Sequence, residues 1–197
     1  MAYVLAGAAG FLVLLLFDWA DSRGLRKGKP LIMIGAWALF LFAFIAILKS
    51  PDRFFVPRAL RIIAGVPAIL FFLLFLYSLL LEIPFGQTYG GAEGDRRVVA
   101  TGTYALVRHP AVIWFFLFHL SLVLVVGSRL LLIAVPFWTG MNILLVAVED
   151  KVFFPRTFGD SYRRYQHDVP FLIPTPASIR QCVTTFRLPF PRRRAAP

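Results

Sequence analysis

The stretch of the sequence with the clearest chemical potential is Arg108-His109-Pro110, which stands directly before an apolar run. Pro110 suits the first turn of a helix, so Arg108 and His109 are expected at the amino-terminal end of that helix. Free amide groups and the helix dipole favour an anion there, and a guanidinium offers paired donors for a carboxylate or phosphate. The competing interpretation is that Arg108 reaches lipid headgroups and His109 is a plain interfacial residue.

Two acidic residues, Glu149 and Asp150, end the next apolar run. Only residues 127–129 separate the two runs, so the runs must form an antiparallel helical hairpin. The hairpin returns the acids to the level of Arg108 and His109, on the same face of the membrane. Either acid is a candidate for a functional carboxylate at this place. An ion pair that only closes the bundle is the alternative.

Aromatic residues follow the acids at partly helical spacing and predict an amphipathic helix on the membrane surface. Such a stripe packs against its neighbours in most proteins, and it can also wall a pocket for an aromatic or cationic ligand. The aromatic stripe includes Phe158, Tyr162 and Tyr165, with Gly159 inside it. Prolines are expected to stop this helix and leave the rest of the tail irregular: Pro170, Pro174 and Pro176.

Two polar residues lie inside the apolar runs of the hairpin. His119 belongs to the first run and Asn142 to the second. Each is predicted to form a hydrogen bond across the helix pair rather than to contact a ligand. The lone cysteine, Cys182, permits no internal disulfide and no zinc cluster, and the sequence predicts no metal site.

Long apolar runs make up most of the chain and must position these residues. Hydrophobic residues account for 59% of the sequence and the mean hydropathy is +0.75, beyond the roughly half-apolar composition of soluble domains. Each run is near the ~20 residues that a bilayer core requires. The fold class predicted is all-α, an integral membrane bundle of about five transmembrane helices with a C-terminal amphipathic cytoplasmic segment. The runs are Tyr3 to Phe17, Leu31 to Leu48, Leu60 to Leu81, Pro110 to Val126 and Leu130 to Val148.

The order of these features divides the chain into three regions. Residues 1–83 form a three-span membrane region. Residues 84–174 form the catalytic region, which comprises a glycine-rich cytoplasmic loop, the helical hairpin and the amphipathic segment. Residues 175–197 form a basic tail.

The charge of the chain predicts its orientation. The formal net charge is +11, and residues 151–197 hold nine Lys and Arg against two Asp, a net of +7. Such a tail predicts a cytoplasmic C-terminus in contact with anionic lipid, and therefore an N-terminus on the outside. No nucleic-acid partner is predicted. One connection disagrees, because Lys49, Arg53, Arg58 and Arg61 oppose only Asp52 on the side predicted to be outside.

The ordered set of motifs resembles a known family. The order is G-x-Y-x-x-x-R-H-P at residues 102–110, a hydrophobic hairpin, an acidic pair, F-G-x-x-Y-x-x-Y at residues 158–165 and a proline-rich end. It is similar to the isoprenylcysteine carboxyl methyltransferases and their relatives, the phospholipid methyltransferases. Two positions depart from the family pattern. Val112 stands where a pocket tyrosine is common, and Lys151 follows the acids where relatives often carry further acids. The second departure leaves open which of the two acids is functional, and we favour Glu149 over Asp150.

The resemblance implies an integral-membrane methyltransferase that depends on S-adenosylmethionine and acts on a membrane lipid or lipidated acceptor. It implies a cofactor pocket formed by the last two spans and the segment after them. Arg108 and Glu149 are the implied catalytic residues. The implied cofactor-binding residues are Tyr104, Arg108, His109, Pro110, Glu149, Asp150, Tyr162 and Tyr165.

Several alternatives stay open at the level of sequence. The acceptor could be a carboxylate, which needs no proton transfer, or an amine, which needs a group to accept its proton. A related architecture in membrane sterol reductases makes an NADPH-dependent reductase of a lipid double bond the second reading, with Arg163 and Arg164 available for a 2′-phosphate. A membrane scaffold without enzymatic activity is the third. The sequence does not set the oligomeric state.

Overall fold

The structure is a computed structural model and describes residues 1–23, 29–82 and 98–186. The glycine-rich loop and the end of the basic tail that the sequence predicts therefore lie largely outside the described residues. The described part is helical and contains no strand. Its elements are α1 (Ala2–Ser22), α2 (Lys29–Lys49), α3 (Arg58–Leu76), η1 (Tyr77–Leu81), α5 (Thr103–Leu106), α6 (Pro110–Val126), α7 (Arg129–Val148), η2 (Glu149–Phe153), α8 (Phe154–Phe158), α9 (Asp160–Asp168) and α10 (Pro176–Thr185).

Apolar helices of the length that crosses a bilayer confirm the predicted all-α membrane bundle. Within the described residues, four candidate spans meet this criterion, namely Ala2–Ala20, Pro30–Lys49, Arg58–Leu81 and Arg129–Phe158, and the apolar helix Pro110–Val126 is shorter, with 17 residues. Their outer surfaces are apolar as well. Along α3, Ile62, Val66 and Ile69 are each at least 65% exposed, as expected where lipid rather than water is the solvent.

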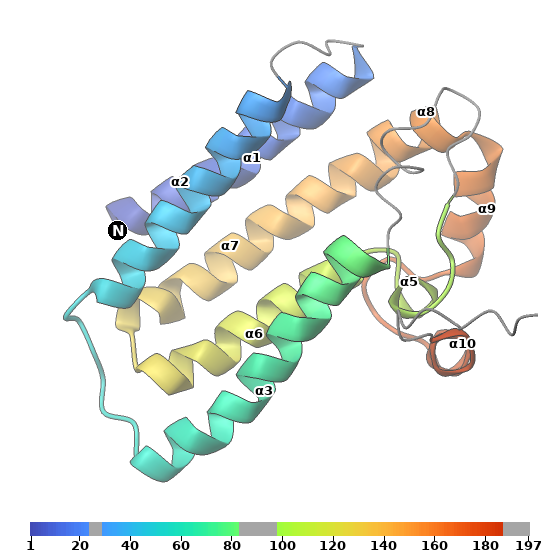
Figure 1. The fold of residues 1–197 in the computed structure, drawn as a ribbon. Coiled ribbons are helices and arrows are strands. Elements are labelled where there is room, and N and C mark those ends of the chain that lie inside the picture. Colours follow the sequence, from blue (N-terminus) through green and yellow to red (C-terminus); the bar gives the residue numbers. More distant parts are fainter. Residues whose placement is uncertain (24–28, 83–97, 187–197) are drawn as a thin grey trace, which may run out of the picture.

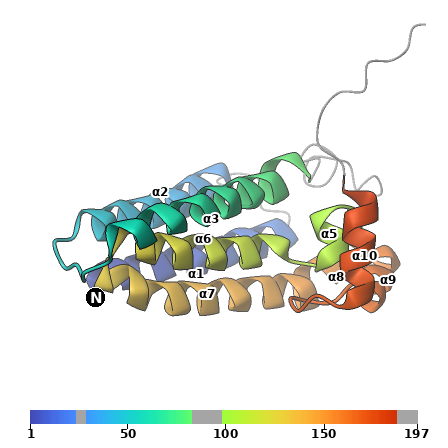
Figure 2. The ribbon, with the colours of Figure 1, turned by 90° about the horizontal axis from the view of Figure 1, so that it is seen from below.

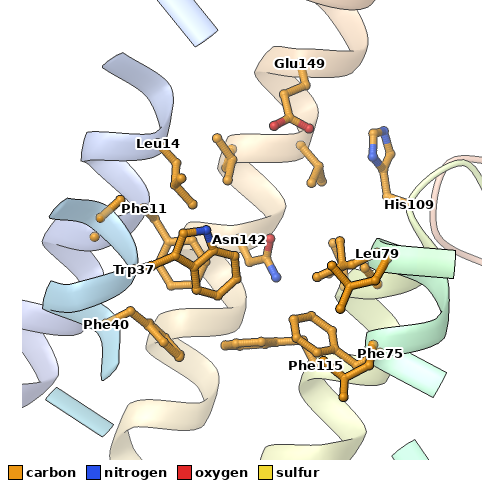
Figure 3. Close-up of a pocket in the computed structure, with 18 of the residues that line it drawn as sticks. Phe11, Leu14, Trp37, Phe40, Phe75, Leu79, His109, Phe115, Asn142 and Glu149 are labelled. Atoms are coloured by element: carbon orange, nitrogen blue, oxygen red, sulfur yellow. The ribbon is translucent and has the colours of Figure 1, made fainter. Parts of the chain in front are cut away.

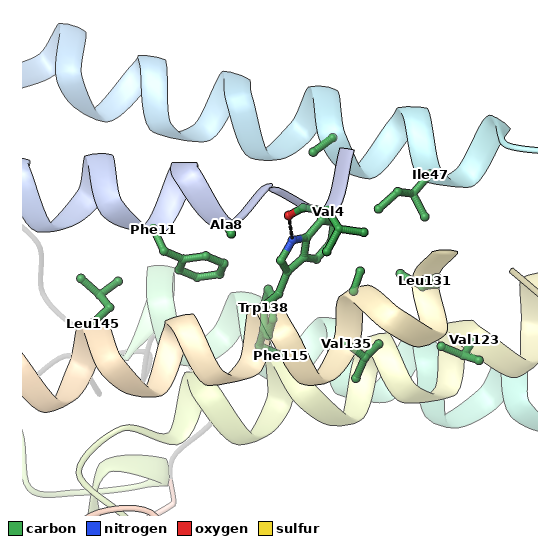
Figure 4. Close-up of a cluster of buried hydrophobic side chains, with 12 residues drawn as sticks. Val4, Ala8, Phe11, Ile47, Phe115, Val123, Leu131, Val135, Trp138 and Leu145 are labelled. Carbon is green, nitrogen blue, oxygen red and sulfur yellow. Dashed lines mark hydrogen bonds between the residues drawn. The ribbon is translucent and has the colours of Figure 1, made fainter. Parts of the chain in front are cut away.

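The bundle consists of two helix pairs joined by α7 (Figure 1). Helix α1 packs against α2, α3 packs against α6, and α7 contacts both α1 and α6. The α1–α7 contact is close because Gly7 faces the ring of Trp138; a Cβ atom on Gly7 would lie 2.4 Å from that ring. Trp138 is fully buried, and its Nε1 donates a hydrogen bond to the carbonyl of Val4 at 2.8 Å (Figure 4). Small residues at such crossings let membrane helices approach each other.

The turn between α6 and α7 confirms the predicted hairpin. Gly127 ends α6 in the left-handed conformation (φ +70°), and the Ser128 side chain caps α7 by accepting a hydrogen bond from the amide of Leu131. The same end holds part of the basic connection. Arg53 donates to the carbonyls of Leu48 and Val126, at the ends of α2 and α6. These hydrogen bonds satisfy carbonyl groups that helix ends leave unpaired. They are a structural reason for a basic residue at this position, whatever the orientation of the chain in the membrane.

The opposite end of the bundle carries the short helices. The amphipathic segment is two helices rather than one, because Gly159 takes a positive φ of +60° between α8 and α9. The prediction that Pro176 helps to stop this segment and that an irregular tail follows was wrong. Pro176 begins α10, and Thr175 caps α10 through a reciprocal capping box with Ser178. Helix α10 lies across the end of the bundle beside α5 (Figure 2).

Candidate functional site

Asp150 is the centre of the polar cluster at this end. It is 3% exposed, and its Oδ1 atom lies 3.1 Å from Nε of Arg108 and 3.4 Å from Nε2 of His109. The Tyr162 hydroxyl donates to the same Oδ1 at 2.7 Å, and the Gln166 amide donates to Oδ2 at 3.1 Å. The hairpin therefore brings an acid to Arg108 and His109, as the sequence predicted. The acid that meets them is Asp150, whereas the sequence reasoning favoured Glu149.

The helical turn Glu149–Phe153 explains why the two acids point in different directions. Consecutive residues of a helix are about 100° apart, so neighbouring side chains cannot face the same partner. This turn is also π-helical, a feature found often at functional sites, and it continues α7 into α8. Asp150 faces α9, while Glu149 lines the cavity and has Asp18 of α1 as a neighbour.

Arg108 is held by several groups besides Asp150. Its Nη1 donates to the carbonyl of Gln166 at 2.7 Å, its backbone amide donates to the carbonyl of Pro170 at 2.9 Å, and its guanidinium lies 5.6 Å from the centre of the Phe171 ring. Nε is buried and makes no directional hydrogen bond within the described part of the chain. Helix α9 and the segment after it thus fix Arg108 while leaving its side chain at the cavity wall.

The predicted tyrosines support the same cluster. The Tyr165 hydroxyl donates to the carbonyl of Tyr104 at 2.7 Å, and the Tyr104 hydroxyl donates to the carbonyl of Ser78 at 3.2 Å. Tyr104, Tyr162 and Tyr165 all line the cavity. Pro110 does not line it and acts locally, as the first residue of α6. The stripe of rings is therefore both packing and pocket wall.

A cavity of about 1000 Å³ opens beside this cluster and runs down between α2, α3, α6 and α7. At one end it is lined by Arg108, His109 and Glu149. Most of its remaining wall is aliphatic or aromatic and comes from the membrane helices. Figure 3 shows Glu149, the first residue of η2 at the end of α7, projecting into this space, with aromatic rings such as Phe115 further along the wall. The cavity thus joins a polar end to an apolar region at membrane depth.

Burial sets the protonation of the groups at the polar end. It lowers the pKa of His109, although the nearby Asp150 carboxylate acts in the opposite direction. His109 is therefore neutral at physiological pH. Burial also raises the pKa of Tyr162, and the hydrogen bond to Asp150 adds to the effect. Burial likewise raises the pKa of Tyr165. Both phenols keep their protons and act as donors.

Sequence reasoning missed two sets of residues. Gln166 binds both Asp150 and Arg108, and its spacing of four residues from Tyr162 on a helix was the available signal. The second set anchors α5 to the end of α3: Glu82 accepts hydrogen bonds from the amide and hydroxyl of Thr103, and Ser78 bonds the Thr103 hydroxyl at 3.0 Å. Burial raises the pKa of Glu82. No spacing in the sequence links these residues.

The prediction that His119 and Asn142 bond across the helix pair was wrong. Nδ1 of His119 bonds the carbonyl of Phe115, four residues earlier in its own helix, at 2.8 Å. The Asn142 side chain has no hydrogen-bond partner among the residues that the structure describes. Both residues line the cavity instead. Arg163 and Arg164, which the reductase reading requires, are exposed on α9 and do not line the cavity.

Comparison with known proteins identifies the family. A sequence model of the phospholipid methyltransferases matches residues 60–161, which is more than half of the chain. The chain belongs to the phospholipid methyltransferase family. It is also 33% identical over 82 residues to the protein-S-isoprenylcysteine O-methyltransferase of Schizosaccharomyces pombe, a match that covers 41% of this chain and 34% of that protein. The chain therefore spans about a third of the length of this curated relative. No solved structure matches the chain.

The matched region of the family contains most of the site. Residues 60–161 include Arg108, His109, Glu149 and Asp150, together with the wall of the cavity formed by α3, α6 and α7. The resemblance stated from the motifs is thereby confirmed at the level of the family.

Proposed function

We propose that this chain transfers a methyl group from S-adenosylmethionine to a lipid or lipidated acceptor that reaches the site from the bilayer. The observation that carries the proposal is the cavity, because one continuous space joins a charged end at Arg108 and Glu149 to apolar walls at membrane depth. A polar cofactor fits the first part and a hydrocarbon chain fits the second. The family and the relative from Schizosaccharomyces pombe support methyl transfer as the chemistry.

The polar end suits the chemical groups of S-adenosylmethionine. Arg108 offers a guanidinium for the carboxylate of the cofactor, and Glu149 offers a carboxyl group for its ammonium or ribose hydroxyls. Tyr162 and Phe158 bring aromatic rings to the same wall, and such rings favour a flat purine or a cationic sulfonium. Asp150 acts through Arg108, His109 and Tyr162, since it does not line the cavity itself.

The work of the protein in this reaction is mainly alignment and exclusion of water. When bound, S-adenosylmethionine supplies a methyl group on a sulfonium, which is transferred by in-line displacement. Holding two reactants in the reactive geometry contributes up to roughly 7–11 kcal/mol in favourable cases. A carboxylate acceptor needs no proton transfer. An amine acceptor must lose a proton, and Glu149 and the neutral His109 are the groups at the cavity wall available to take it.

Equilibrium binding of radiolabelled S-adenosylmethionine and of NADPH to the purified chain tests the proposal. The wild type should bind S-adenosylmethionine, and Glu149→Gln should weaken this binding about tenfold or more, the effect of losing a charge-assisted hydrogen bond. Arg163→Ala is the matched control, because its side chain is 73% exposed and lies away from the cavity. Binding of NADPH without S-adenosylmethionine would overturn this proposal in favour of a lipid reductase. Binding of neither cofactor would leave only the membrane scaffold without enzymatic activity.

A further inference from the structure

The end of the bundle opposite the cluster around Asp150 carries a second concentration of charge. Helix ends gather there, since the connection 50–57 joins α2 to α3 and the turn around Gly127 joins α6 to α7 (Figure 1). An excess of positive charge at a membrane surface attracts anionic lipid unless the chain itself balances it. Residues 49–61 and 127–129 hold one acid and five basic residues, which are Lys49, Arg53, Arg58, Arg61 and Arg129.

The chain balances some of these charges and leaves others unpaired. Arg129 pairs with Asp52, with Nη1 and Oδ1 3.1 Å apart. Arg53 donates to the carbonyls of Leu48 and Val126, at the ends of α2 and α6. Because Asp52 is the one acid of residues 49–61 and 127–129, no acid of this segment remains for the other cations. Arg58 and Arg61 are exposed and form no ion pair with any described residue.

Arg58 and Arg61 are neighbours at the start of α3. Residues three apart lie side by side on a helix, so the two like charges repel each other unless an anion lies between them. Nε of Arg61 donates to the carbonyl of Val56 at 3.2 Å, and its other donors have no partner in the described part of the chain. A phosphate group would satisfy both side chains, because each guanidinium offers paired donors for its oxygens.

The connection that leads to these arginines is fixed in place. The Phe54 amide donates to the carbonyl of Gly127 at 2.7 Å, and Arg53 forms an antiparallel bridge with Ser128. Phe54 packs against the core, whereas the next residue, Phe55, is 87% exposed. Exposed aromatic rings close to basic residues are typical of segments that insert at the boundary between headgroups and acyl chains. The surface is therefore preformed and suited to lipid.

An apolar stripe on the outer face of α3 continues from the arginines toward the middle of the bilayer. Ile62 and Val66 follow Arg58 at intervals of four residues, and Ile69 and Leu73 continue the same face. All four are more than half exposed. A phospholipid has the same arrangement, namely a charged headgroup above a hydrocarbon chain. A free phosphate ion would use only the two arginines.

We propose that the start of α3 binds an anionic phospholipid, with the phosphate between Arg58 and Arg61 and an acyl chain along the apolar stripe. The excess of basic residues selects a lipid with net negative charge over a zwitterionic lipid. The site lies at the end of the bundle away from Asp150, so the inference does not depend on methyl transfer. It also accounts for a basic connection on the side of the membrane that the charge of the tail predicts to be outside.

A fluorescent reporter next to the site measures lipid binding at this place rather than at the basic tail. In a Cys182→Ser background, Ala59→Cys is labelled with bimane, because Ala59 is exposed beside Arg58. Phosphatidylglycerol and phosphatidylcholine, each with a nitroxide quencher near the headgroup end of one acyl chain, are titrated separately in a neutral detergent at low salt. Half-maximal quenching should need about 20-fold less phosphatidylglycerol, since each arginine near an anionic lipid contributes about fivefold.

Variants assign this preference to the two arginines. Arg58→Gln together with Arg61→Gln should abolish the preference for phosphatidylglycerol. Arg58→Gln alone should reduce it about fivefold, and this variant removes no hydrogen bond within the described chain, so it tests the site even where the double variant unfolds. Arg156→Gln together with Arg163→Gln is the matched control, because it removes the same charge from exposed positions at the other end and should leave the preference unchanged.

Several results would overturn the assignment. Equal quenching by both lipids would show that the site does not select net charge. A preference that persists in the double variant, or that disappears in the matched control, would place its origin elsewhere. Inorganic phosphate and glycerol 3-phosphate should release no more labelled phosphatidylglycerol than sodium chloride of equal ionic strength. A greater release would show that the arginines bind free phosphate and that the apolar stripe has no part in binding.

Discussion

Replacing Asp150 by asparagine removes the charge that balances Arg108 at the centre of the site. The side chains of Arg108 and Asp150 are 13% and 5% exposed, and their Nε and Oδ1 atoms lie 3.1 Å apart. Removal of one partner of a buried ion pair typically costs about 3–5 kcal/mol. Asparagine keeps an oxygen that accepts the Tyr162 hydrogen bond, so we expect the lower end, about 3 kcal/mol.

This loss is measurable as a change in thermal stability. For a chain of this size, about 3 kcal/mol lowers Tm by about 6–12 °C. The assay is thermal unfolding of purified variants in one fixed mixture of detergent and lipid, followed by tryptophan fluorescence. Asp160→Asn is the matched control, because its side chain is 89% exposed and its ion pair with Arg163 is 3.8 Å long. Such surface pairs contribute little, so its Tm should stay within about 2 °C of wild type.

The neighbouring acid should behave in the opposite way. Glu149→Gln keeps the volume and hydrogen-bonding capacity of the side chain that faces Asp18 and the cavity. We therefore expect a small change in Tm together with weaker binding of S-adenosylmethionine. Equal Tm values for Asp150→Asn and Asp160→Asn would refute the central role of Asp150. A larger loss of stability in Glu149→Gln than in Asp150→Asn would refute the division of roles between the acids.

Three further predictions follow from other parts of the structure. Gly7→Ala places a Cβ atom against the buried Trp138 ring and should cost about 1–3 kcal/mol by thermal unfolding, whereas Gly140→Ala, with open space around it, should be neutral. Burial lowers the pKa of His109, so the unfolded chain takes up a proton first; Tm should fall as the pH drops below about 6.5, and His109→Gln should reduce that slope. In a Cys182→Ser background, a membrane-impermeant maleimide applied to intact cells should label Ser50→Cys and not Thr184→Cys; the reverse pattern would invert the orientation proposed from charge.

Much of the fold follows from the pattern of apolar residues. The helix from Pro110 to Val126 has the bounds that the sequence predicts, and the short turn around Gly127 forces the hairpin. This information is local, since run length and turn residues act within a few positions of the chain. The approach of Arg108 to an acid also follows, because the hairpin fixes the level of both.

The tail is predicted less well, because its helices depend on single backbone positions. Gly159 divides the amphipathic stretch through a positive φ, and Thr175 and Pro176 start a helix where prolines alone indicate an end. A proline can end one helix or begin another. Only the capping residues next to the proline distinguish the two cases.

The identity of the partners within the site is a property of the tertiary structure alone. The helical hairpin places Glu149 and Asp150 at one level of the membrane, but the directions of their side chains depend on the π-helical turn and on the position of α9. Asn142 and His119 are equally polar in a sequence, and only the packing of the helices shows that both residues line a cavity and do not bond across the helix pair. The sequence determined which polar groups share a membrane face, because the lengths of the apolar runs and of the turn between them are local properties of the chain. The tertiary structure decided which of them bind each other and which remain available for a ligand, because that choice depends on how distant helices are turned about their axes.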